Sequence, residues 1–227
     1  MARLPRLLLD HHAHLLSQRV QQGQMLARDD VDRARWHELL RRAVARDGVA
    51  LYAWALVDDR FELLAAAPHA TQLSRLMQSL ARDHAAAYNR RHGRHGGLWQ
   101  GRFRAAVVEP GDWLLRCMLH VDRLGGGGGD PRWSSRAVHE GSASDAALVM
   151  PGAYWALGNT PFEREAAYRE RLQEPPGMAE QARIEAALRG GWALGSPEFT
   201  GGLAEGVERP VAPRPRGRPR RSSVTSH

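Results

Sequence analysis

The residues best suited to chemistry are the arginines and histidines gathered in residues 89–104. Guanidinium groups bind phosphate, glycines let a backbone approach closely, and an indole ring can stack on an unpaired base. The side chains here that could contact nucleic acid are Arg90, Arg91, His92, Arg94, Trp99, Gln100, Arg102 and Arg104. The segment therefore predicts a phosphate-binding loop. The alternative is structural, because arginine and histidine at the end of a helix also complement its dipole and cap its last carbonyls.

A second basic motif lies near the C-terminus. Arg216 and Arg218 flank Gly217 between two prolines, and Arg220 and Arg221 follow. An extended Arg-Gly-Arg core can lie in the narrow minor groove of A·T-rich DNA, and the motif resembles an AT-hook. The alternative is a solvated basic tail that binds any polyanion by releasing counterions.

The composition limits the class of protein. The chain has 227 residues with 32 basic against 25 acidic side chains, and every basic one is arginine, so a single arginine is weak evidence of function. From Arg209 onward there are arginines and no acid, which leaves the body of the chain nearly neutral. Cys117 is the single cysteine, so the sequence predicts neither an intramolecular disulfide nor a cysteine-based zinc site. No apolar run reaches ~20 residues, and we expect a cytoplasmic protein without a membrane partner.

The periodicity of apolar residues predicts an α+β fold. Alternating or continuous apolar runs indicate strands at 4–19, 49–57, 61–66 and 103–109. Amphipathic segments indicate helices at 31–46, 71–91 and 112–124, with caps expected at Asp29–Asp30 and Thr71 and a stop before the glycines at 125–129. This order predicts a ferredoxin-like antiparallel sheet with helices packed on it.

The remaining sequence divides into two further parts. We expect a main domain at 1–130 and a C-terminal extension at 131–205, with loops and two helices at 161–173 and 178–188. Residues 206–227 are rich in proline, arginine, glycine and serine, and they predict a disordered tail.

Asn-Arg-Arg-His-Gly-Arg-x-Gly-x-Leu-Trp-Gln-Gly-Arg-Phe, at 89–103, resembles the signature of the REP-associated tyrosine transposases, members of the HUH single-tyrosine class. Further stretches agree with this family in order and spacing, at 1–19, 29–33, 112–115, 133–135 and 191–196. The resemblance implies DNA transposition and recombination, with binding of single-stranded or hairpin DNA, a homodimer in some members, and a nucleoid-associated bacterial protein. It also implies two histidines on one strand that hold Mg²⁺ or Mn²⁺ and a tyrosine that attacks the phosphate to leave a 5′-phosphotyrosine link.

The sequence departs from the family at these catalytic positions. Arg60 and Glu62 occupy the two histidine positions, and His120 occupies the position of the tyrosine. Protonated arginine has no lone pair for a metal, and Glu62, alone or with Asp59, would make a weak oxygen site. Tyr88 is expected to pack inward. We therefore expect no metal cofactor, and a degenerate family member that binds DNA without strand transfer.

Two alternatives stay open. The first is an active DNA-cleaving enzyme with an atypical site built from Glu62, Asp59 and His120. The second is a fold that now serves protein partners, through the helix at 31–46 or the extension at 161–188.

Overall fold

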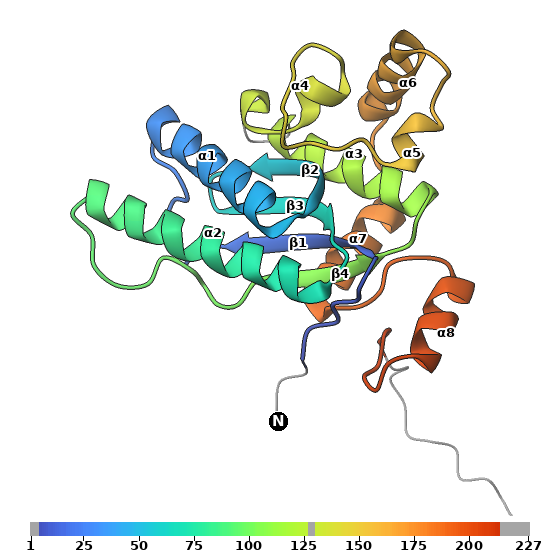
Figure 1. Cartoon of the computed structure of the whole chain (residues 1–227), viewed down its shortest axis with the longest axis horizontal. Coiled ribbons are helices and arrows are strands. Elements are labelled where there is room, and N and C mark those ends of the chain that lie inside the picture. Colours follow the sequence, from blue (N-terminus) through green and yellow to red (C-terminus); the bar gives the residue numbers. More distant parts are fainter. Residues whose placement is uncertain (1–4, 127–129, 214–227) are drawn as a thin grey trace, which may run out of the picture.

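The strands form one antiparallel sheet, in a computed structural model that describes residues 5–126 and 130–213. They are β1 (Ala13–Arg19), β2 (Ala50–Leu56), β3 (Arg60–Ala66) and β4 (Arg104–Val108). Their order is β2-β3-β1-β4, and each neighbouring pair is antiparallel (Figure 1). With the helices after β1 and β3, this is the ferredoxin-like arrangement, which confirms the predicted fold class.

Two helices cover one face of the sheet, α1 (Asp30–Asp47) and α2 (Ala70–Arg91). Asp29 caps α1 by accepting the N–H of Asp32, and Gly48 ends it with a φ of 62°, a left-handed conformation that favours glycine. The cap of α2 is His69 together with Gln72, so the expected cap at Thr71 is wrong by two residues. Alternate strand residues, among them Leu16, Phe61 and Leu63, pack with Trp36, Leu40, Leu76 and Met77 in the core beneath these helices.

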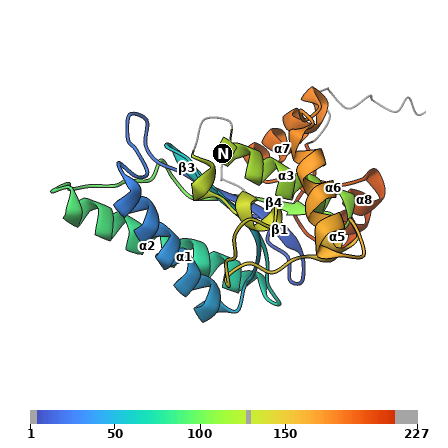
Figure 2. The ribbon, with the colours of Figure 1, turned by 90° about the horizontal axis from the view of Figure 1, so that it is seen from above.

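The opposite face is covered by α3 (Asp112–Gly126) and α7 (Met178–Gly190). Figure 2 shows this pair on one side of the sheet and α1 and α2 on the other. Leu15 and Leu64 point to this second face and pack with Leu115, Met118 and Ile184. The helix α3 includes Gly125 and Gly126 and so runs past the stop expected before the glycines.

The extension contains η1 (Pro131–Trp133), α4 (Arg136–His139), α5 (Gly152–Trp155), α6 (Pro161–Gln173) and α8 (Pro197–Glu205). The helices predicted at 161–173 and 178–188 are confirmed as α6 and α7. Backbone bridges join Ala55 to Ser134 and Val108 to Leu194, so the extension covers both edges of the sheet. Within the described ranges, no helix is both long and apolar enough to cross a membrane.

Both ends of the described chain differ from expectation. The strand predicted at 4–19 forms only from Ala13, and the irregular segment before it passes through His11 with a φ of 59°. Leu7 in that segment packs with Val107 and with Val211, which lies in the predicted tail. Residues 206–213 are therefore packed against the fold, because Val211 is buried and its carbonyl accepts the N–H of Ala193.

Candidate nucleic-acid interface

A cleft of about 630 Å³ opens on the face of the sheet that carries α3 and α7. Antiparallel register puts Ser17 opposite both Glu62 and Arg104, which forms one row of side chains across three strands. Arg19 pairs with Arg60 at the same end of the sheet. We call this site the arginine cleft, after the five arginines that line it: Arg19, Arg60, Arg102, Arg104 and Arg189.

The floor of the arginine cleft is a hydrogen-bonded group around Glu62. Arg60 Nε donates to Glu62 Oε1 at 2.9 Å, and Ser17 Oγ donates to the same oxygen at 3.4 Å. His120 Nε2, from α3, lies 3.1 Å from Glu62 Oε2. The three positions at which the sequence departs from the transposase pattern therefore lie together in the structure.

Glu62 is an ionised group in a buried place. Burial favours the neutral acid, but the hydrogen bonds and charges of His120 and Arg60 outweigh burial and hold the pKa of Glu62 below its usual value. Burial also acts to lower the pKa of Arg60, but Glu62 and Asp59 raise that pKa overall. The floor of the cleft is thus a fixed ion pair.

These residues do not fit a divalent metal. Both oxygens of Glu62 are engaged by donors, and the neighbouring guanidinium offers no lone pair. Elsewhere in residues 5–126 and 130–213, no group of three or more histidine, cysteine or acidic side chains could hold a metal ion.

The electrostatic character of the cleft is cationic. Its lining has five arginines and two carboxylates, Glu62 and Glu185, a formal charge of +3 before His120 is counted. Arg102 and Arg104 are exposed and have no ion-pair partner in the part of the chain that the structure describes. Gln100 also lines the cleft, with its backbone N–H bonded to the carbonyl of Arg19. The second half of the basic loop therefore faces the cleft.

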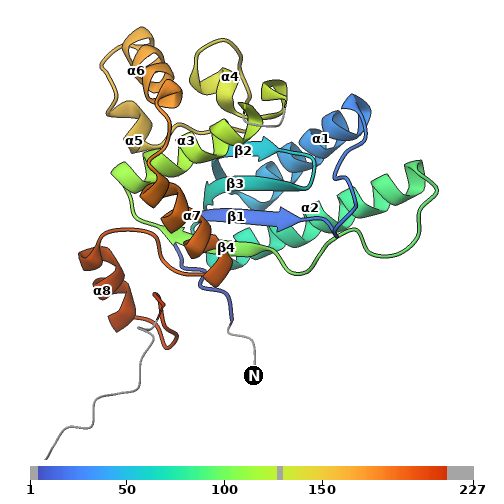
Figure 3. The ribbon, with the colours of Figure 1, turned by 180° about the vertical axis from the view of Figure 1, so that it is seen from behind.

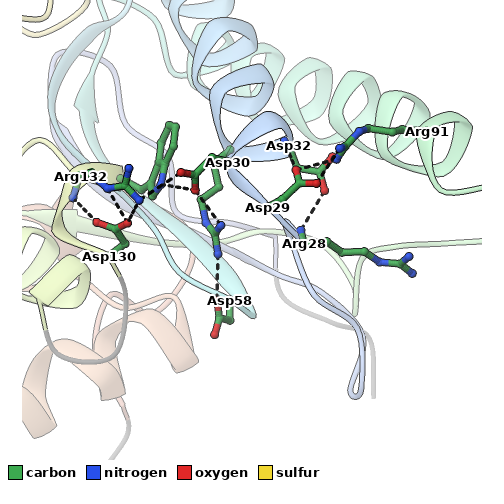
Figure 4. Close-up of polar contacts among 10 residues, drawn as sticks. Arg28, Asp29, Asp30, Asp32, Asp58, Arg91, Asp130 and Arg132 are labelled. Carbon is green, nitrogen blue, oxygen red and sulfur yellow. Dashed lines mark hydrogen bonds and ion pairs between the residues drawn. The ribbon is translucent and has the colours of Figure 1, made fainter.

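The first half of the loop has other contacts. Arg91 donates to Asp29 at 2.7 Å and to Asp32 at 2.6 Å (Figure 4). His92 lies 2.8 Å from Asp32, so Arg91 and His92 clamp the end of α2 to the start of α1. Arg91 lowers the pKa of Asp29 by hydrogen bonding. Arg91 and His92 are therefore held by carboxylates of α1, a structural role that differs from the carbonyl capping expected as the alternative from sequence.

The remaining side chains of the loop are either packed in the fold or exposed to solvent. Trp99 packs edge-on against Phe61 and donates its Nε1–H to the carbonyl of Ala81 at 2.9 Å, so its ring belongs to the packing under α2. Arg94 lies over the ring of Tyr88, which is buried as expected. Arg90 is exposed and, among the described residues, has no ion-pair partner.

A second ionic group joins the extension to α1. Arg132 contacts Asp130 and Asp30, and Arg33 lies between Asp30 and Asp58 (Figure 4). In these ion pairs the charges of Arg132 and Arg33 are matched by neighbouring carboxylates. None of these residues lines the arginine cleft, so the ion pairs leave the arginines of the cleft unpaired with them.

Sequence reasoning missed Arg19 and Arg189 in the cleft. Arg19 had a signal, because it lies two residues from Ser17 on a predicted strand and must share its face. No signal in the sequence could have placed Arg189 in the cleft, because its position depends on how α7 packs on the sheet. Arg216, Arg218, Arg220 and Arg221 lie outside the described residues.

No curated protein matches the chain. One similar solved structure is a REP-associated tyrosine transposase bound to a REP hairpin, with 10% identity, a TM-score of 0.48 and coverage of 66% of this chain and 98% of that one. Another is a candidate transposase from Deinococcus radiodurans R1, with 19% identity, a TM-score of 0.36 and coverage of 48% and 88%.

The family comparison is the informative one. The family model described as "Transposase IS200 like" matches residues 9–112, which contain all four strands, α1, α2 and the basic loop. This match confirms the resemblance to tyrosine transposases found in the sequence. Over residues 9–112, a little under half of the chain, this protein is therefore similar to the IS200-like transposase family.

Proposed function

We propose that this protein binds single-stranded or hairpin DNA in the arginine cleft and does not carry out transposase strand transfer. The observation that carries the proposal is the group Arg60–Glu62–His120. It keeps a guanidinium fixed on the floor of a cationic cleft, at the positions where the resemblance implies metal ligands and a tyrosine.

The cleft suits a phosphodiester backbone. Arginine binds phosphate with paired N–H donors, and Arg102 and Arg104 are exposed for such contacts. Arg60 is held by Glu62 and Asp59, so little freedom is lost when it meets an anion. Binding through these groups needs no divalent ion.

The same geometry argues against the chemistry of the family. A tyrosine nucleophile needs a phenol beside the scissile phosphate, and His120 stands in its place with Nε2 facing Glu62. The side chains around Glu62 do not fit a metal that would stabilise the developing charge on the phosphate. The proposal is therefore a family member that retains DNA binding after loss of strand transfer.

The C-terminal arginines extend the proposal. Arg216, Arg218, Arg220 and Arg221 would tether the protein to duplex DNA, through the minor groove or by counterion release. The resemblance adds homodimer formation and association with the bacterial nucleoid to the proposed properties.

Fluorescence anisotropy with labelled hairpin, single-stranded and duplex oligonucleotides tests the proposal. We expect the double variant Arg102→Gln/Arg104→Gln to lose about 2 kcal/mol of binding free energy, roughly thirtyfold in affinity. Addition of EDTA should leave the affinity of the wild type unchanged. Equal affinity of the double variant and the wild type would refute the cleft as the DNA site.

A second candidate is a nuclease that uses an atypical site of Glu62, Asp59 and His120. The observation in its favour is the contact between His120 and Glu62, since a carboxylate that orients an imidazole is a recurring feature of acid–base sites. Incubation of the protein with hairpin DNA and Mg²⁺ or Mn²⁺ distinguishes a nuclease from a protein that only binds DNA. A covalent protein–DNA adduct, or nicking that Glu62→Ala abolishes, would establish the nuclease. Absence of binding to every oligonucleotide at low salt would instead favour a role in protein interaction.

A further inference from the structure

The helix α7 forms one side of the arginine cleft, although it lies outside the residues matched by the transposase family. Figure 3 shows α7 lying across β1 and β4. Gln181, Glu185 and Arg189 are spaced by four residues, so they share one side of the helix, and all three line the cleft. Ile184 and Leu188 are buried and hold the helix in place.

The position of α7 is fixed by several contacts. Arg116 on α3 pairs with Glu180 at the start of α7. Arg183 lies 4.3 Å from the ring centre of Trp113 and donates to the carbonyl of Gly195 at 2.7 Å. Gly191 ends the helix with a φ of 66°. The polar row of α7 is therefore presented to the cleft by a rigid element.

The size of the cleft selects the form of the DNA. Its volume of about 630 Å³ falls in the range of small-molecule pockets, roughly 300–1,000 Å³. Such a space takes one or two nucleotides of an unpaired strand, because a base-paired duplex is much wider than a small ligand.

We propose that α7 is the second wall of a site for unpaired DNA, in which Arg189 contacts a backbone phosphate held over Arg104 and Glu185 opposes it. The inference rests on the proposed function of the cleft. Arg189 is exposed and, in residues 5–126 and 130–213, has no ion-pair partner, as is true of Arg104 on the sheet. A phosphate between them meets cations from two directions. Glu185 lines the same space and repels it.

The test uses two substitutions that predict opposite effects. The probe is a fluorescein-labelled oligothymidylate of about 12 nucleotides, compared with the same strand annealed to its complement. Arg189→Gln should weaken binding of the unpaired strand about fivefold and reduce the slope of log K against log salt by about 0.7. Glu185→Gln should tighten binding about twofold. Neither change should alter the affinity for the duplex by as much.

The matched controls are Arg42→Gln and Glu38→Gln on α1, across the sheet from the cleft. Their side chains are 73% and 49% exposed and pair with each other, so they repeat the charge changes at a remote surface. If Arg189→Gln and Glu185→Gln behave like these controls while Arg102→Gln/Arg104→Gln loses binding, α7 is not a wall and the proposed function stands. If the Arg102→Gln/Arg104→Gln variant also binds normally, the proposed function itself fails.

Discussion

Glu62 is the residue that decides the character of the arginine cleft. It is 4% exposed and touches Arg60, Ser17 and His120, each from a different element. A buried carboxylate is tolerated only when its charge and lone pairs are matched, and here every contact supplies a donor. A change at this one position therefore affects the guanidinium and the imidazole together.

We expect Glu62→Gln to lower the free energy of unfolding by about 3 kcal/mol, because it leaves Arg60 without its buried counter-charge. Denaturant titration at neutral pH measures this change. The matched control is Glu38→Gln, which removes an exposed partner of Arg42 and should cost less than about 1 kcal/mol.

The loss of stability in Glu62→Gln should depend on pH. The pKa of Glu62 in the folded protein lies below its ordinary value of 4.5, so the unfolded chain binds the proton more readily. Its contribution to stability is complete above pH 4.5 and is lost as the pH falls through the lowered pKa. The difference between wild type and Glu62→Gln should shrink with acidification below pH 4.5. A difference that stays constant or grows would contradict the assigned ion pair.

At the scale of elements, a buried polar group joins the extension to the sheet domain. Asp122 on α3 is fully buried. Its carboxylate accepts hydrogen bonds from the hydroxyls of Ser135 at 2.5 Å and Tyr168 at 2.6 Å, and it lies 2.6 Å from His139 Nδ1. These partners come from the segment after η1, from α6 and from α4. Because α3 also supplies His120, the extension and the floor of the cleft share one helix.

Tyr168→Phe tests this connection. Loss of the hydroxyl leaves one oxygen of Asp122 with fewer donors, so we expect a loss of about 1–2 kcal/mol in the free energy of unfolding. Hydrogen exchange should accelerate in α6 more than in β1. The control is Tyr52→Phe, whose hydroxyl has no hydrogen-bond partner among the described residues. Equal effects of the two substitutions would mean that the Asp122 group does not hold the extension.

The elements were predictable where local pattern and burial agree. The alternation of Leu15, Leu16, Leu63 and Leu64 between two covered faces made β1 and β3 recognisable, and Asp29 marked the start of α1. The features that the sequence did not predict depend on long-range contacts. No local signal shows that Leu7 leaves the sheet to pack with Val211, or that α7 docks on β4 with Arg189 in the cleft. The site was predictable at Arg60, Glu62 and His120 because a family resemblance supplied their alignment.

At the scale of the whole molecule, charge is divided between a folded body and its C-terminal end. The formal charge is +7, and residues 214–227 contain five arginines and no acid. Removal of these residues leaves a formal charge of +2, concentrated locally in the cleft. Under the proposed function, specific contact with an unpaired strand and general attraction to DNA would be carried by different parts of the chain and would respond differently to salt.

Two truncations separate these parts. Deletion of 214–227 should preserve the fold and reduce the slope of log K against log salt by about 3 to 4, since each arginine that binds a phosphate releases counterions. Deletion from 209 should also lower thermal stability, because Arg209 donates to the carbonyl of Gly191 at 2.8 Å and Val211 is buried. Anisotropy over a range of salt concentrations and thermal melting measure the two effects. An unchanged slope after deletion of 214–227 would show that these residues take no part in DNA binding.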